Sequence, residues 1–116
     1  MQLKLSTQTE GGAIVIDCMG RIVFGDESSL LRDYVKKAIS ENNRIVLNLA
    51  EVSYIDSGGL GTLVALRTTA LNAGGTIKLA NLTQRVSDVL QITKLITVFE
   101  AFNSVPEAVE SFRQAA

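Results

Sequence analysis

Residues 52–61 mark the change from a predicted buried strand to a predicted helix, and they read Val52-Ser53-Tyr54-Ile55-Asp56-Ser57-Gly58-Gly59-Leu60-Gly61. Three glycines close together remove side-chain bulk at this point of the chain. Asp56 and Ser57 add a carboxylate and a hydroxyl where the first N–H groups of a helix lack partners. The stretch therefore suits a helix cap, a phosphate or a partner protein, and these three interpretations stay open at this point.

Apolar residues on both sides of the motif define the elements that it joins. Residues 44–49 form a short and nearly continuous apolar run, which is typical of a central parallel strand. Within the predicted helix, residues 60–73 have one apolar arc, which contains Leu60, Leu63, Val64, Leu66, Ala70 and Leu71. Arg67 interrupts this arc. Either that part of the helix face is exposed, or the aliphatic stem of Arg67 packs while its head reaches water.

Two strands and a helix are predicted before the motif. Leu3–Thr7 alternates between apolar and polar residues, and the glycines within Thr9–Gly12 favour a hairpin turn. Ala13–Val23 is rich in β-branched residues and is predicted as a strand buried on at least one side, with a bulge or bend at Gly20. A helix follows from Glu27 to about Asn43, because small polar and acidic residues open it and apolar residues then recur at helical spacing.

A strand and a short helix are predicted directly after the motif's helix. Gly74-Gly75 ends that helix, and Thr76–Ala80 forms a strand in which Lys78 belongs to the polar, alternating side. Asn81 or Thr83 then caps a short helix.

The last predicted elements are a brief β-branched strand within residues 92–99 and a helix that opens at Val105–Glu107. Strands and helices thus alternate after an initial pair of strands. This order predicts an α/β fold with right-handed crossovers, in which about four helices cover a mixed, mostly parallel sheet of about five strands. The chain is expected to form one domain, residues 1–116. Asp56 and Ser57 fall at the carboxyl end of a parallel strand, where such sheets place functional loops.

Composition and charge exclude several classes of protein. Apolar residues make up 47% of the chain and charged residues 20%, which indicates a soluble globular fold. A net charge of -1 gives no basic surface for nucleic acid. One cysteine, Cys18, and no histidine exclude an intramolecular disulfide and the usual zinc patterns. With neither a signal peptide nor an apolar segment long enough to span a bilayer, we expect a cytoplasmic protein with no membrane insertion.

The residues also argue against an enzyme. A serine nucleophile needs a base, and the chain has no histidine to form a Ser-His-Asp triad. Ile55 breaks the G-x-S-x-G pattern, and the glycines of the motif lack both the Lys-Ser/Thr of a P-loop and the dinucleotide spacing. The carboxylates are scattered along the chain. We therefore expect no catalytic residue, no metal site and no cofactor.

Ser57 has two serious interpretations. In the structural one, Asp56 or Ser57 is only the helix N-cap, and Gly58-Gly59 allows a tight turn. Two consecutive glycines cost stability where they are helical, about 0.5 to 1 kcal/mol each, so a cap alone does not explain them. In the functional one, the glycines keep the surface flat for a partner and leave the Ser57 hydroxyl open to a kinase.

These residues resemble the STAS-domain anti-sigma factor antagonists. The likeness rests on the strand at residues 45–49 and on the D-S-x-G-L-G element at residues 56–61. It also includes Gly20-Arg21-Ile22, the break at residues 74–75 with the strand after it, and the segments around residues 89–95 and 98–99. The family often has Ser or Thr at the position of Gly58 and Asp at that of Val23. Gly58 leaves Ser57 as the only hydroxyl in the turn.

The resemblance implies a single STAS-type domain that takes part in partner switching. The unmodified domain binds an anti-sigma factor that is also a serine kinase, which frees a sigma factor for transcription. That kinase phosphorylates Ser57 and ends the binding, and a phosphatase restores it. The domain is expected to be a monomer, with partner contacts at Gly25, Asp26, Asp56, Gly58, Gly59, Leu60, Gly61, Thr62 and Arg67. The alternative is a STAS module that is not phosphorylated and regulates a transporter or another signalling complex.

Overall fold

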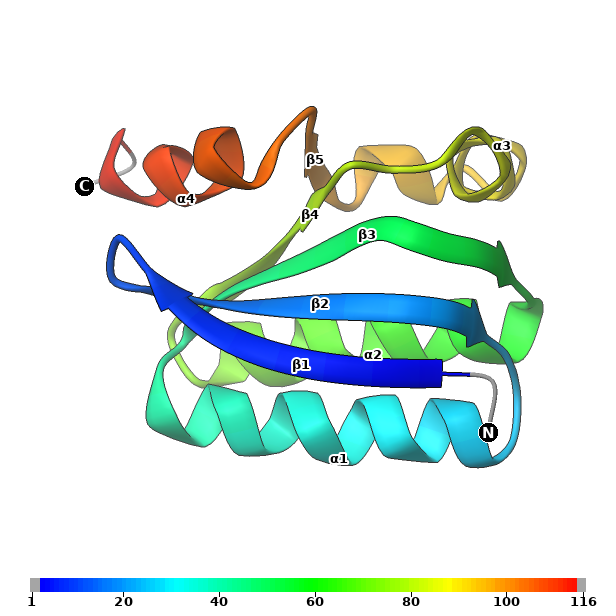
Figure 1. Ribbon diagram of the computed structural model, residues 1–116, viewed down its shortest axis with the longest axis horizontal. Helices are drawn as coiled ribbons and strands as arrows, with labels where there is room; N and C mark the ends of the chain where they lie inside the picture. The colour runs from blue at the N-terminus through cyan, green and yellow to red at the C-terminus, as the bar shows by residue number, and fades with distance from the viewer. Residues whose placement is uncertain (1–2, 115–116) are drawn as a thin grey trace.

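A five-stranded sheet lies between two pairs of helices in the computed structural model, which describes residues 3–114 (Figure 1). The outermost residues of the expected 1–116 domain lie outside the described residues. The strands follow in the order β1-β2-β3-β4-β5, and β1 is antiparallel to β2 while all later pairs are parallel. Their bounds are β1 Leu3–Glu10, β2 Ala13–Ile22, β3 Arg44–Ile55, β4 Thr76–Ala80 and β5 Glu100–Phe102. The predicted mixed, mostly parallel α/β sheet is therefore confirmed.

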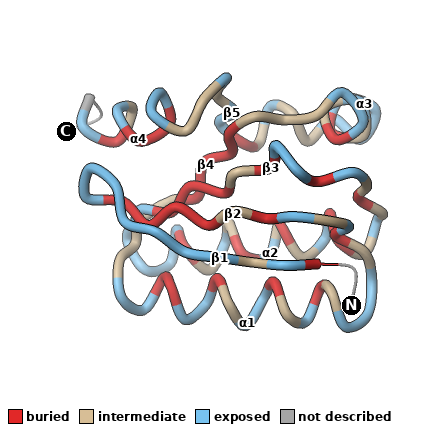
Figure 2. Tube along the Cα trace, viewed as in Figure 1, coloured by how far each residue is buried: buried red, intermediate tan, exposed pale blue. Residues whose placement is uncertain are grey.

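Helices cover both faces of this sheet. Helices α1 and α2 pack on one face, and α3 and α4 lie over the other (Figure 1). The bounds are α1 Asp26–Glu41, α2 Ser57–Asn72, α3 Gln84–Ile92 and α4 Val105–Gln114, with a 3-10 helix, η1, at Leu95–Thr97. Burial concentrates in β2, β3, β4 and the inner sides of the helices, whereas β1 is mostly exposed (Figure 2). The apolar runs of the central strands thus form the core, as strands covered on both faces require.

Several predicted elements are confirmed to the residue or nearly so. The strand at Thr76–Ala80 and the helix opening at Val105 lie where the pattern predicts them. Thr83, one of two predicted caps, accepts a hydrogen bond from the Val86 N–H at 3.3 Å. The bulge predicted at Gly20 is confirmed by shifts in the pairing of β2 with β3 on both sides of that residue.

One predicted boundary beside the motif was wrong. The strand expected to end at Leu49 continues to Ile55, because pairing with β2 resumes at Glu51 after a register shift. Helix α2 begins at Ser57 after the Asp56 cap, which is one of the two helix starts that the sequence predicts. The brief strand expected within residues 92–99 was also misplaced: η1 occupies that stretch and β5 follows at Glu100.

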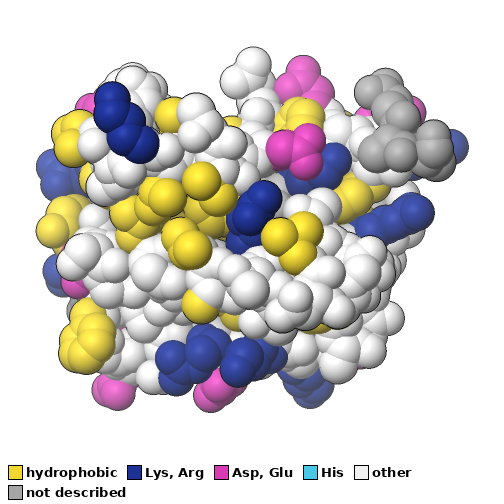
Figure 3. Space-filling view, turned by 180° about the vertical axis from the view of Figure 1, so that it is seen from behind, with side chains coloured by type: hydrophobic (Ala, Val, Ile, Leu, Met, Phe, Trp, Pro, Cys, Tyr) yellow, Lys and Arg dark blue, Asp and Glu magenta, His cyan; other side chains and the backbone are white. Residues whose placement is uncertain are grey.

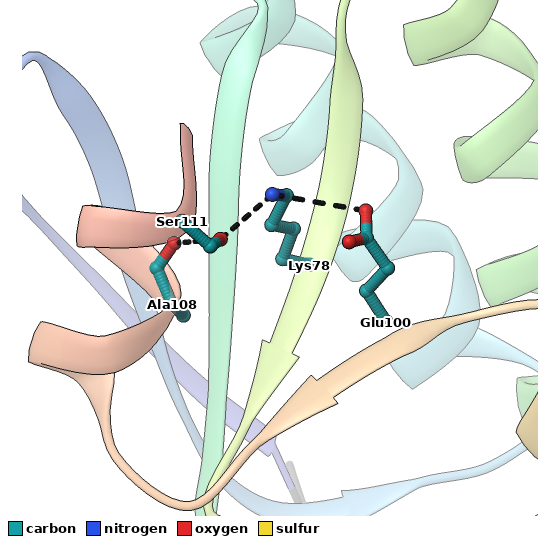
Figure 4. Close-up of polar contacts among 4 residues, drawn as sticks. All are labelled: Lys78, Glu100, Ala108 and Ser111. Carbon is teal, nitrogen blue, oxygen red and sulfur yellow. Dashed lines mark hydrogen bonds and ion pairs between the residues drawn. The ribbon is translucent and has the colours of Figure 1, made fainter. Parts of the chain in front are cut away.

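Lys78 departs from its predicted outward position. It is 3% exposed, and its Nζ donates to the Ser111 hydroxyl at 2.7 Å (Figure 4). The same atom lies 3.7 Å from a carboxylate oxygen of Glu100 and 4.4 Å above the centre of the Phe112 ring. Helix α4 covers the face that alternation assigns to solvent, and β5, paired beside β4, supplies Glu100. The stem of Lys78 therefore packs in the core, and its charge is paired there.

Lys78 offers a test of whether packing or charge holds α4 on the sheet. We expect Lys78→Ala to lower the free energy of unfolding by about 2–3 kcal/mol, because it leaves a cavity under α4. Lys78→Met fills the same space without a buried charge and is expected to stay within about 1 kcal/mol of the parent. Urea unfolding of both variants measures the difference. Equal losses in the two variants would contradict the packing explanation.

Candidate functional site

Asp56 is the N-cap of α2. Its Oδ1 accepts a hydrogen bond from the Gly59 N–H at 2.8 Å, as a capping carboxylate does. The Phe24 N–H, from the loop after β2, donates to both carboxylate oxygens at 3.1 Å. The hydrogen bond from Gly59, followed by those from Phe24 and Gly58, lowers the pKa of Asp56 below its ordinary value, against an opposing effect of burial. One carboxylate thus joins the start of α2 to the β2–α1 loop.

Ser57 is the first residue of α2, and its side chain is exposed. Since Asp56 caps the helix, the Ser57 hydroxyl is not needed for that purpose. It makes no hydrogen bond with any other residue in the range 3–114. Of the two candidate caps in the sequence, the structure therefore selects Asp56 and leaves Ser57 available.

Two of the three glycines in the motif are explained by steric contacts within the domain. A β-carbon on Gly59 would clash with the carbonyl oxygen of Ile22, and one on Gly58 would lie 2.6 Å from Cβ of Phe24. Both positions therefore serve the close approach of β2 and its loop to α2. Gly61 differs, because a β-carbon there meets nothing within 4 Å. The interpretation that glycine keeps the surface flat for a partner applies to Gly61 only.

Hydrogen bonds also fix the loop after β2, which contacts the Ser57 turn. The Val23 carbonyl accepts from the Ser28 N–H at 3.1 Å and from the Ser28 hydroxyl at 2.6 Å. Gly25 has φ 107°, a conformation that favours glycine. Phe24, between them, is 80% exposed.

A shallow hollow of about 350 Å³ lies between the starts of α1 and α2. Of the residues predicted as partner contacts, the structure brings Gly25, Gly58, Gly61 and Thr62 to this hollow, together with Ser57. Its wall is completed by Phe24, Ser28, Ser29, Arg32 and Ala65.

Besides Asp56, which caps α2, four predicted contact residues do not line the hollow. Gly59 and Leu60 are buried under the loop and in the core, so they cannot form a surface contact, which corrects the expectation. Arg67 is half-buried in the third turn of α2 and lies outside the hollow. Asp26 is exposed at the start of α1, next to Gly25.

Sequence reasoning missed Phe24 and Arg32 as members of this surface. Phe24 follows the β-branched run that ends at Val23, and it looks like one more strand residue. Its place directly before Gly25-Asp26 is the signal that could have marked it as a loop residue. Arg32 has no local signal, because it reaches the hollow only through the packing of α1 beside α2.

Other features of the described residues add no second chemical site. Within residues 3–114, no three acidic or cysteine side chains gather in a way that would hold a metal ion. Burial, with a smaller effect of the Asp17 carboxylate, raises the pKa of the Cys18 thiol to about 12, so this thiol stays protonated. On the back of the molecule, basic and acidic side chains are interspersed (Figure 3). Across the described range, each helix is too short or too polar to cross a membrane.

The Asp56 cap predicts a specific dependence of stability on pH. Because the folded pKa of Asp56 lies below its ordinary value of 3.8, the charged carboxylate stabilises the fold above that pH. This contribution is lost as the pH falls through the folded pKa. We expect Asp56→Asn to be less stable than the parent by roughly 0.3–1 kcal/mol at pH 7, because the amide can still cap the helix but lacks the negative charge that the helix start favours. The gap should narrow below about pH 4, and urea unfolding at several pH values measures it. A gap that is independent of pH would mean that the charge contributes nothing.

Comparison with known proteins places this geometry in a family. The STAS domain family model matches residues 4–108. A STAS-domain containing protein of Pseudomonas aeruginosa is 30% identical over 100 residues, which cover 86% of this chain and 98% of that protein. The anti-sigma-B factor antagonist of Bacillus subtilis is 31% identical over 101 residues, covering 86% and 91%. Among solved structures, the phosphorylated form of the Bacillus cell fate determinant SpoIIAA superposes with a TM-score of 0.70 at 20% identity, covering 95% and 98%.

The family match extends over most of the described elements, from β1 to the first turns of α4. It therefore includes the Asp56 cap, the Ser57 turn and the β2–α1 loop. Relatives over most of the chain length include anti-sigma factor antagonists. The chain belongs to the STAS domain family.

Proposed function

We propose that this domain is an anti-sigma factor antagonist whose binding is switched by phosphorylation of Ser57. In its unmodified form it binds an anti-sigma factor that is also a serine kinase, and so releases a sigma factor. Phosphorylation of Ser57 by that kinase ends the complex, and a phosphatase regenerates the binding form. The domain acts in the cytoplasm through protein contacts, without catalytic chemistry of its own.

One observation carries this proposal: Ser57 is exposed at a helix start that another residue caps. A serine that serves as N-cap has its oxygen engaged with the helix backbone. Here Asp56 takes that position, and the Ser57 hydroxyl has no hydrogen bond within residues 3–114. A kinase can therefore reach this hydroxyl without first opening the helix.

The local electrostatics favour an effect on binding over an effect on folding. A phosphate on Ser57 would add about -1.5 to -2 charge at pH 7. The dipole and free N–H groups at the start of α2 attract this charge, whereas the Asp56 carboxylate repels it. The two effects oppose each other within the domain. At a protein interface the same charge would have to lose its water, which costs several kcal/mol unless the partner supplies a counter-charge.

Gly61 supports a contact surface on α2. It is exposed inside a helix, where glycine costs about 1 kcal/mol relative to alanine, and no neighbour excludes a β-carbon there. The fold itself gives no reason for this residue. A partner that packs closely against the first turns of α2 does.

The experiment is to incubate the purified domain with ATP and each anti-sigma-type serine kinase of the same organism, and then to locate the added mass by peptide sequencing. We expect one phosphate, on Ser57, and none on the Ser57→Ala control. Phosphate on another residue, or none with any of these kinases, would contradict the switch. The unphosphorylated transporter-type module then becomes the better interpretation.

A further inference from the structure

Phe24 combines a fixed backbone with a free side chain. Its N–H donates to both oxygens of Asp56, and the preceding carbonyl, of Val23, accepts two hydrogen bonds from Ser28. The ring itself is 80% exposed. Phe99 and Phe112, by contrast, are buried in the core. The fold thus holds this one phenyl group in water on a loop that has little freedom to withdraw it.

The contact of Phe24 with α2 places the ring beside Ser57. The space that a β-carbon of Gly58 would need is filled by Cβ, Cδ1 and Cα of Phe24. Gly58 follows Ser57 directly, and Phe24 and Ser57 both line the same hollow of about 350 Å³. The absence of a side chain at position 58 is therefore what lets Phe24 approach the phosphoacceptor.

An aromatic side chain displayed in this way is suited to binding. Aromatic residues that enter a dry pocket of the partner dominate the energetics of many interfaces. A ring on a loop that is already ordered loses little further entropy when it binds. Single exposed apolar side chains are common on protein surfaces, so exposure alone does not indicate a binding role. The hydrogen bonds that fix the loop, and the position beside Ser57, distinguish this ring.

We propose that Phe24 is the apolar anchor by which the kinase that phosphorylates Ser57 holds this domain. The inference rests on the proposed function. An enzyme whose phosphoryl donor reaches the Ser57 oxygen must cover the hollow, and with it the phenyl ring. The partner is therefore a protein with an apolar pocket next to its nucleotide site, and Phe24 fills that pocket while Ser57 faces the nucleotide.

The test compares Phe24→Ala with Ile92→Ala. Ile92 is also 80% exposed, but it lies at the last residue of α3, away from the hollow, so it controls for loss of surface hydrophobicity in general. The anti-sigma-type serine kinases of the same organism are titrated with each variant, and kcat/KM for phosphorylation of Ser57 is measured. We expect Phe24→Ala to lower both affinity and kcat/KM by about 30-fold or more, and Ile92→Ala by less than about two-fold. Both melting temperatures should stay within a few degrees of the parent.

Each of the following outcomes would contradict the proposal that Phe24 is the anchor. If the parent is phosphorylated and Phe24→Ala behaves like the parent, the anchor is wrong while the proposed function stands. If no kinase binds or phosphorylates the parent, the proposed function fails and the anchor fails with it. If the melting temperature of Phe24→Ala falls by more than about 10 °C, the ring stabilises the folded domain and is not a free anchor. Dimerisation of the free domain that Phe24→Ala abolishes would assign the ring to a second copy of this chain.

Discussion

Replacement of Gly59 by alanine is expected to lower the free energy of unfolding by about 3 kcal/mol or more, and the melting temperature by roughly 10–20 °C. The added β-carbon would overlap sterically with the Ile22 carbonyl oxygen. Neither backbone can move away easily, because the Asp56 N–H donates to that same oxygen at 3.3 Å and Asp56 also holds Phe24. Thermal unfolding followed by circular dichroism measures the loss.

Gly61→Ala is the matched control, since it makes the same chemical change two residues further along α2. No neighbour lies within 4 Å of the new β-carbon, so this variant is expected to gain about 0.5–1 kcal/mol from helix propensity. A Gly59→Ala protein as stable as the parent would mean that β2 and α2 do not approach as closely as described. The contact that places the β2–α1 loop beside the Ser57 turn would then be wrong.

Ser57→Asp is expected to weaken binding to the cognate kinase by more than about 100-fold, with a change in melting temperature of only a few degrees. The new carboxylate must be desolvated at the interface, which costs several kcal/mol. Within the domain it sits at the start of α2, where a negative charge is favoured, although Asp56 is close. Isothermal titration and thermal unfolding of the same sample separate the two effects.

Ser57→Ala provides the opposite control for this charge. It removes a hydroxyl that has no hydrogen bond within the described residues, so folding and binding should both be retained while phosphorylation is lost. If Ser57→Asp instead unfolds the domain, Ser57 has a structural role that the Asp56 cap does not explain. That result would contradict the proposed phosphorylation switch at Ser57.

The regular parts of the fold follow from local patterns. The strand at Thr76–Ala80 and the helix opening at Val105 are correctly predicted, because alternation, proline and glycine act over a few residues. Lys78 is wrongly placed by the same pattern, because Phe112 and Ser111, which cover it, come from a helix more than twenty-five residues later. Long-range packing of this kind leaves no trace in the local alternation of polar and apolar residues.

The candidate site shows the same division between local and distant effects. The spacing of Asp56, Ser57 and the glycines correctly predicts a helix start with an open hydroxyl. Which residue caps the helix could not be predicted, because Asp and Ser are about equally good N-caps. The structure favours Asp56, whose second carboxylate oxygen also accepts from Phe24, 32 positions earlier in the chain. The same distant contact accounts for Gly58, which a local interpretation assigns to the partner surface.

The most direct test of the switch is the affinity of one kinase for two forms of the domain, unmodified and carrying phosphoserine at position 57. Incorporation of phosphoserine during synthesis makes the second form independent of any kinase. We predict micromolar or tighter binding of the unmodified domain and binding weaker by more than about 100-fold after phosphorylation, with nearly equal melting temperatures. Equal affinity of the two forms for a kinase that binds the unmodified domain would contradict the account.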